Sequence, residues 1–115
     1  MGIINRIYNK RMSLRLTHKE EALREAKRIA EILGEQFGAS EVILYGSLAK
    51  DAWFDAASDI DLAVKGLGDN YLTAYGYCLG ISRFNLDIKP YEDMPEKYSK
   101  TIAKEGRFLY ARSGN

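Results

Sequence analysis

Two aspartates separated by one residue are the first feature of this 115-residue chain that could do chemistry. Asp59 and Asp61 lie in a stretch, 59–65, where polar and apolar residues alternate as in a half-buried strand. Residues two apart on a strand project from the same face, and like charges that close raise each other's pKa unless a cation lies between them. Such a pair of carboxylates suits Mg²⁺, which combines protein oxygens with phosphate oxygens and water.

A third aspartate, Asp87, stands on the polar face of another predicted strand, 83–89. If that strand neighbours 59–65, the three carboxylates gather in one cluster. Three carboxylates could hold two divalent ions, which activate an attacking oxygen and stabilise a leaving one. Taken singly, each aspartate could equally be a solvated residue on an exposed strand face.

A possible phosphate site precedes the aspartates. The apolar stretch 41–46, a predicted buried strand, ends at Gly46. Ser47 follows, and 48–50 is a predicted helix start. Glycine allows a ligand to approach the backbone closely, and the free amides at a helix N-terminus attract phosphate. The Ser47 hydroxyl adds a hydrogen-bond donor. A Gly-Ser pair alone more often marks an ordinary turn, so its meaning depends on the motifs that follow.

The elements that must position these residues can be read from periodicity. A helix is expected to begin at Thr17, because the residues from there match a capping box and apolar residues follow at helical spacing. Gly34 or Gly38 would end it, and His18, the only histidine, is expected to be exposed at its start. The remaining expected elements are a loop over 51–58, a helix from Asp69 or Asn70 to about Leu79, a turn between Pro90 and Pro95, a helix over 96–104 ended by Gly106, and a strand or packed tail at 108–110.

These elements predict an α/β fold, a small mixed sheet with helices mainly on one face and the carboxylates on the other. One domain is expected over 17–115, preceded by a basic extension over 1–16. The extension either docks loosely on the domain or contacts a partner or a polyanion.

Composition narrows the classes of partner. There are 17 Lys and Arg against 16 Asp and Glu, a net charge of +1, so strong attraction to nucleic acid or a membrane is not expected. No apolar run approaches the ~20 residues of a membrane span, and no signal peptide is apparent. The single cysteine, Cys78, cannot form an internal disulfide, which favours a reducing, cytoplasmic location.

Tyrosines are numerous, eight in all. Tyr71 and Tyr75 lie one turn apart on a predicted helix. They could belong to an exposed interface, where tyrosine buries apolar area and keeps a polar tip, or they could cover the edge of the core.

In its order, the pattern G-S-L-A-K, S-D-I-D-L-A-V and N-L-D-I resembles the nucleotidyltransferase superfamily related to DNA polymerase beta. The short length and the ending I-A-K-E-G-R-F-L-Y look like the minimal nucleotidyltransferases, which are commonly paired with HEPN-domain toxins. The resemblance covers about residues 20–110. It implies that Gly46 and Ser47 bind the triphosphate of ATP or another NTP, and that Asp59, Asp61 and Asp87 hold two Mg²⁺ ions, with Asp87 helping to deprotonate the acceptor.

Two departures from the family pattern follow Gly-Ser. Leu48 stands where many relatives have Arg, and Asp51 replaces a Gly, while Lys50 keeps the second positive charge and would bind phosphate. The resemblance implies transfer of AMP to a tyrosine of a HEPN-type toxin within a hetero-oligomer, which would make the protein an antitoxin. The alternatives are a catalytically idle antitoxin that acts by contact and an antibiotic-modifying nucleotidyltransferase.

Overall fold

The computed structural model describes residues 3–50, 54–55 and 57–112, with side chains described from Thr17 onward. The elements in chain order are α1 (Ile3–Phe37), β1 (Glu41–Tyr45), β2 (Asp59–Lys65), the 3₁₀ turn η1 (Gly68–Asn70), α2 (Tyr71–Ile81), β3 (Asn85–Pro90), the 3₁₀ turn η2 (Tyr91–Asp93), α3 (Glu96–Glu105) and β4 (Arg107–Ala111). Within these described residues no helix is both long and apolar enough to span a membrane.

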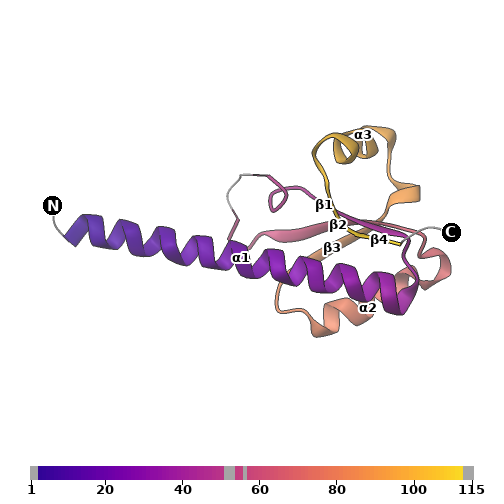
Figure 1. Cartoon of the computed structure of the whole chain (residues 1–115), viewed down its shortest axis with the longest axis horizontal. Helices are drawn as coiled ribbons and strands as arrows, with labels where there is room; N and C mark the ends of the chain where they lie inside the picture. The colour runs from indigo at the N-terminus through magenta and orange to yellow at the C-terminus, as the bar shows by residue number, and fades with distance from the viewer. Residues whose placement is uncertain (1–2, 51–53, 56, 113–115) are drawn as a thin grey trace.

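The sheet has the strand order β3-β2-β1-β4 (Figure 1). β1 pairs antiparallel with β2 and β4, whereas β2 pairs parallel with β3. Helices α1 and α2 cover one face, and the shorter α3 lies over the other (Figure 1). The predicted mixed sheet with helices mainly on one face is therefore confirmed.

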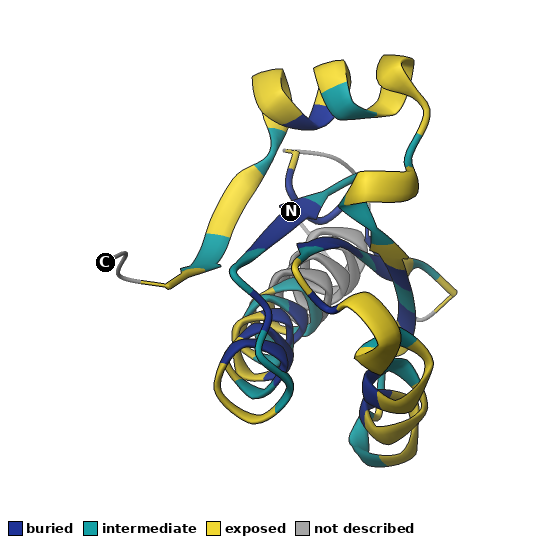
Figure 2. Ribbon diagram, turned by 90° about the vertical axis from the view of Figure 1, so that its right-hand side faces the viewer, coloured by how far each residue is buried: buried dark blue, intermediate teal, exposed yellow. Residues whose placement is uncertain are grey.

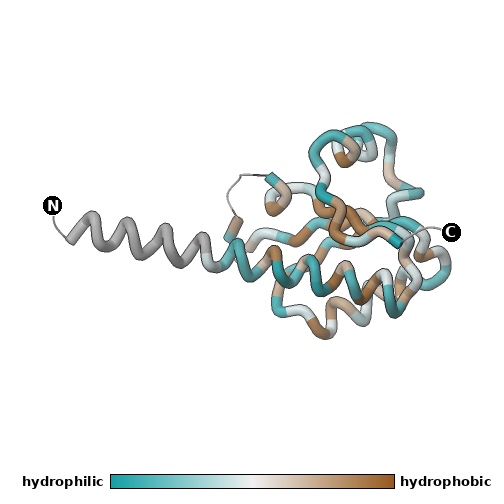
Figure 3. Tube along the Cα trace, viewed as in Figure 1, coloured by the Kyte–Doolittle hydropathy of each residue, from teal (hydrophilic) through white to brown (hydrophobic). Residues whose placement is uncertain are grey.

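Alternation along the strands divides the buried residues between the two faces. Ile60, Leu62 and Val64 of β2 belong to the larger core, which they share with apolar residues of α1 such as Ile29 and Leu33. Ala63 faces the other way, into a small cluster with Ile43 and Ile102 of α3. Figure 2 shows α3 exposed except on the side turned to the sheet, and Figure 3 shows apolar segments of the strands lying between the helices.

The start of the first helix differs from the prediction. α1 begins at Ile3 and runs through Thr17 without interruption, so the capping box predicted there does not form. No Gly or Pro occurs between Ile3 and Leu33, and nothing else in that stretch stops a helix, so Thr17 becomes an interior residue. The helix ends at Phe37, where Gly38 adopts φ 82°, one of the two predicted ends.

The prediction of an exposed His18 is also wrong. Because α1 extends past it, His18 lies inside the helix and is half-buried against two aromatic rings. Its ring centroid is 5.6 Å from that of Phe54 and 5.3 Å from that of Phe84. His18 therefore holds the buried Phe54 of the 51–58 segment, whose Trp53 lies outside the described residues, against α1.

The tyrosines of α2 pack at the edge of the core. The Tyr71 hydroxyl donates a hydrogen bond to the Ile88 carbonyl, and the Tyr75 hydroxyl donates one to the Leu86 carbonyl at 3.0 Å. These two hydrogen bonds tie α2 to β3, which is an edge strand of the sheet. β3 itself begins at Asn85, two residues later than predicted, and includes Pro90.

Gly106 provides a test of the packing between α3 and β1. It ends α3 as predicted, and a Cβ built there would lie 2.5 Å from the Ile102 carbonyl oxygen and 2.6 Å from Ile43 Cγ2. We expect Gly106→Ala to lower the free energy of unfolding by about 1–3 kcal/mol, because the added methyl overpacks this contact. Gly76→Ala is the matched control: its Cβ meets nothing within 4 Å, and it should stabilise α2 by about 0.5–1 kcal/mol. Urea unfolding measures both, and equal effects would contradict this packing.

Candidate active site

The three aspartates of the sequence pattern come together on the α3 face of the sheet. Asp59 and Asp61 lie on β2, and the parallel register places Asp61 opposite Asp87 of β3. One carboxylate oxygen from each of the three lies within 4.8 Å of the others. Asp59 is exposed, whereas Asp61 and Asp87 are half-buried. The predicted convergence is therefore confirmed, and the cluster opens to solvent on the Asp59 side.

Gly46 makes room for the central carboxylate. Tyr45 pairs with Asp61 across β1 and β2, and Gly46 follows with φ 76°, a conformation that side chains rarely adopt. A Cβ at Gly46 would collide with the Asp61 carboxylate and would lie 3.1 Å from its Cγ. Any other residue at Gly46 would therefore be strained and would displace Asp61.

The segment after Gly46 differs from the prediction. Residues 47–50 form a turn, with the Ala49 amide donating to the Gly46 carbonyl at 3.1 Å, and not the predicted helix start. Burial of Leu48 and Ala49 holds this turn against the core. A helix dipole cannot be assigned to the turn, so its contribution to anion binding reduces to backbone amides and the exposed Ser47. Asp51 lies outside the described residues.

Lys50, the predicted phosphate ligand, is engaged by another element. Its Nζ lies 3.0 Å from Oε2 of Glu105 at the end of α3, and both side chains are about half exposed. Its carbonyl accepts a hydrogen bond from Lys19 Nζ at 3.0 Å. An exposed ion pair contributes little stability, so Lys50 can exchange Glu105 for another anion at small cost.

Lys89 is a functional candidate that was not among the site residues predicted from the sequence. Its Nζ lies 2.6 Å from Oδ2 of Asp87, two residues earlier on β3. Burial lowers the pKa of Lys89, but the hydrogen bond to Asp87 and nearby negative charge outweigh burial, and the net pKa is raised. The alternation of β3 already placed Lys89 on the face of Asp87, and that was the signal that could have identified it.

Among the three aspartates of the cluster, Asp61 has a clearly raised pKa. Burial, followed by the charge of Asp87 and, more weakly, that of Asp59, raises its pKa from 3.8 to about 6, against the opposing effect of Lys89. Burial also raises the pKa of the buried Tyr45 hydroxyl, against the opposing effect of the nearby Lys89 ammonium.

The donor set fits a hard divalent cation. All three ligands are carboxylate oxygens, the class that Mg²⁺ prefers, and their mutual repulsion is what a bound cation would relieve. Lys89 already neutralises part of this charge at Asp87.

The raised pKa of Asp61 predicts how stability depends on pH without metal. A folded-state pKa of about 6 means that this group stabilises the fold below pH ~4, and that the contribution is lost as the pH rises through 6. In EDTA at pH 7.5, Asp61→Asn should therefore be more stable than wild type by about 1–2 kcal/mol, a value discounted for partial exposure.

The comparison needs two controls. Asp69→Asn, at an exposed aspartate of η1, should leave the pH dependence unchanged. Mg²⁺ should raise the melting temperature of wild type and of Asp69→Asn but not that of Asp61→Asn, because only the first two keep the full cluster. Parallel pH profiles for Asp61→Asn and wild type would contradict the strain at Asp61.

Comparison with known proteins agrees with this architecture. No curated protein matches the chain in sequence. Eight chains of solved structures match it, among them a chain of the toxin–antitoxin MntA-HpeT, in a mutant with two aspartates, two positions apart, replaced by glutamate. That similarity has a TM-score of 0.63 at 15% identity and covers 76% of this chain and 74% of the other, which shows a shared fold. The family model described as "Polymerase beta, Nucleotidyltransferase" matches residues 27–115. Most of the chain lies within that match, and the chain belongs to the polymerase beta nucleotidyltransferase family.

Proposed function

We propose that this protein is a Mg²⁺-dependent nucleotidyltransferase that moves a nucleoside monophosphate, AMP from ATP, to a hydroxyl group and releases pyrophosphate. The observation that carries the proposal is the convergence of Asp59, Asp61 and Asp87 within 4.8 Å, in a chain of this family. Gly46, in contact with Asp61, joins this cluster to the turn that would bind phosphate.

Different residues of the site would bind the metal ions and the triphosphate. Asp59, Asp61 and Asp87 would hold two Mg²⁺ ions, which when bound offset the charge of the triphosphate and of the developing leaving group. The backbone of the Gly46 turn and the Ser47 hydroxyl would donate hydrogen bonds to the β- and γ-phosphates. Lys50 would leave Glu105 to pair with the same phosphates.

The proposed transfer is a displacement at the α-phosphorus. The acceptor hydroxyl oxygen attacks the α-phosphorus, the bond from that phosphorus to the oxygen bridging to the β-phosphate breaks, and pyrophosphate leaves. The hydroxyl proton passes to the Asp87 carboxylate, which Lys89 holds in position from 2.6 Å. Asp61, which lies between Tyr45 and Asp87 in the sheet, would hold the Mg²⁺ that offsets the charge of the reacting phosphate.

For the acceptor we propose a tyrosine of a HEPN-type toxin, which the modification would silence, so that this protein acts as an antitoxin in a hetero-oligomer. Two observations support this assignment. The sequence resembles the minimal nucleotidyltransferases, and the fold is similar to that of a chain from a toxin–antitoxin structure. The open, Asp59 side of the cluster is the side from which a folded protein could present a hydroxyl.

Removing a single carboxylate should abolish transfer without unfolding the protein. We expect Asp59→Asn or Asp61→Asn to lower nucleotide transfer by several orders of magnitude, because the ions lose both charge and position. The assay incubates the protein with Mg²⁺, labelled ATP and the product of the neighbouring gene, and mass spectrometry measures the mass added to that product. Asp69→Asn, which removes an exposed aspartate outside the cluster, is the matched control and should retain activity.

The idle-antitoxin alternative predicts a different pattern. In that case no nucleotide adds mass to the toxin, and wild type and all three aspartate variants neutralise it equally, with or without Mg²⁺. That result would overturn the enzymatic proposal. Transfer to the hydroxyl of an antibiotic but not to the toxin would leave the proposed chemistry intact and reject the protein acceptor.

Ser47 should matter less than the aspartates. It contributes one hydroxyl in an exposed turn, and losing one hydrogen bond to a charged group costs about 1.5–3 kcal/mol. Ser47→Ala should therefore reduce kcat/KM for ATP by roughly ten- to a hundredfold. Steady-state kinetics at fixed Mg²⁺ measure this change, and a loss as large as that of Asp61→Asn would show that Ser47 has another role.

A further inference from the structure

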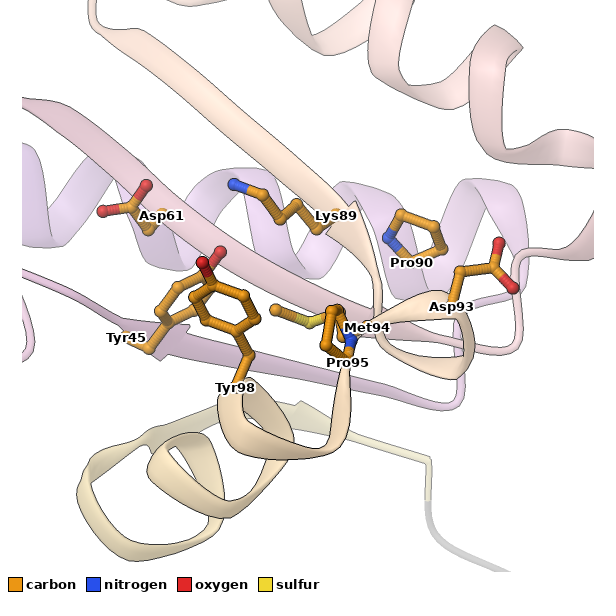
Figure 4. A pocket seen from close by; sticks show the side chains of 8 residues that line it. All are labelled: Tyr45, Asp61, Lys89, Pro90, Asp93, Met94, Pro95 and Tyr98. Carbon is orange, nitrogen blue, oxygen red and sulfur yellow. The ribbon is translucent and has the colours of Figure 1, made fainter.

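A pocket of about 290 Å³ opens beside Asp61 on the α3 face of the sheet (Figure 4). One end is formed by Asp61, Tyr45 and Lys89, and the other by η2 and the start of α3. Most of its wall is apolar or aromatic, made by Pro90, Met94, Pro95 and the rings of Tyr45 and Tyr98. Asp93 supplies a carboxylate away from Asp61 (Figure 4). Its volume is near the lower end for small-ligand pockets, ~300–1,000 Å³.

The pocket shares Asp61 with the aspartate cluster, so whatever occupies it is joined to the reacting phosphate or faces it. Three groups meet at the α-phosphorus: the pyrophosphate leaving group, the nucleoside and the acceptor hydroxyl. The Gly46 turn is the candidate binding site for the pyrophosphate leaving group. The pocket is therefore available to the nucleoside or to the acceptor.

Accessibility and polarity favour the nucleoside. Asp59 is exposed and the Asp87 side chain is 35% exposed, so an acceptor hydroxyl on a folded protein can reach the cluster from solvent without entering the pocket. A tyrosine ring also carries one polar atom, which must lie at the phosphate, and would leave Asp93 unmatched. A nucleobase has polar atoms along its edge and two flat faces, which suit a polar end and aromatic walls.

Tyr98 is the residue best placed to contact a base. Its ring lines the pocket (Figure 4), and 46% of the residue is exposed, so the ring is accessible to a ligand. The Lys97 ammonium lies 5.1 Å from the ring centroid, so positive charge accompanies the aromatic wall.

We infer that this pocket holds the nucleobase of the nucleoside triphosphate, with the Tyr98 ring as its stacking wall. The inference rests on the proposed function, because it assumes that a nucleotide is the substrate. It assigns to Tyr98 a role in binding the base and none in the chemical step.

The test compares two ligands that differ in the nucleoside. Calorimetry in Mg²⁺ measures the Kd of α,β-methylene ATP and of inorganic tripolyphosphate. Tyr98→Ala should raise the Kd of the nucleotide analogue by about 5- to 150-fold, the range of base–aromatic stacking. It should leave the Kd of tripolyphosphate unchanged. Tyr98→Phe should bind like wild type. Tyr77→Ala, at a tyrosine of α2 that is 45% exposed, is the control and should change neither Kd.

Each other outcome separates this inference from the proposed function. Unchanged analogue binding by Tyr98→Ala, with a raised KM for the protein acceptor, would place the acceptor in the pocket and overturn the inference. If Tyr98→Ala weakened the binding of the analogue and of tripolyphosphate equally, the inference would also be overturned, because the base would not be involved. Tyr98-dependent analogue binding without any transfer by wild type would support the base pocket and reject the proposed function.

Discussion

The parallel pairing of β2 with β3 sets Asp61 opposite Asp87, and the repulsion between these two carboxylates is the constraint on which the rest of the site depends. Each of them would be unremarkable on a solvated strand. Burial, followed by the charge of Asp87 and more weakly that of Asp59, raises the pKa of Asp61 to about 6. The fold therefore maintains a group of charges that is stabilised only when positive charge is supplied, and Lys89 supplies a part of it.

Several residues around Asp61 and Asp87 accommodate these two carboxylates or hold them in place. Gly46 has no side chain, so the chain can turn directly over Asp61. Lys89 pairs with Asp87 and limits the excess negative charge of the cluster. Tyr71 and Tyr75 bond the carbonyls of β3 and so hold the edge strand that carries Asp87 against α2. The carboxylate positions thus rest on contacts from β1, β3 and α2 together.

The sequence was most informative where periodicity and chemistry coincide. The alternation of β2 fixes the face of Asp59 and Asp61. Their order after Gly46 and Ser47, with Asp87 further along, carried the resemblance to the family, and the succession of strands and helices predicted the mixed sheet. Local motifs misled where longer context decides: Thr17 matches a helix start, but the uninterrupted residues before it continue the helix. Lys89 could have been identified from the alternation of β3, which places it on the face of Asp87. The pocket could not, because it depends on how η2 and α3 return over the sheet, which no local pattern encodes.

The chain order of the strands has a kinetic consequence. β1 and β2 are antiparallel neighbours, but β3 reaches β2 only after the chain has crossed through η1 and α2. Pairings that close such long loops form slowly, since the entropy of the loop is lost before the contacts form. Asp61 and Asp87 therefore meet only after β3 has paired with β2, and a nascent chain cannot gather all three carboxylates before this crossover is complete. The complete set of three carboxylates consequently reports that this crossover has formed, because no fragment lacking the crossover contains the whole cluster.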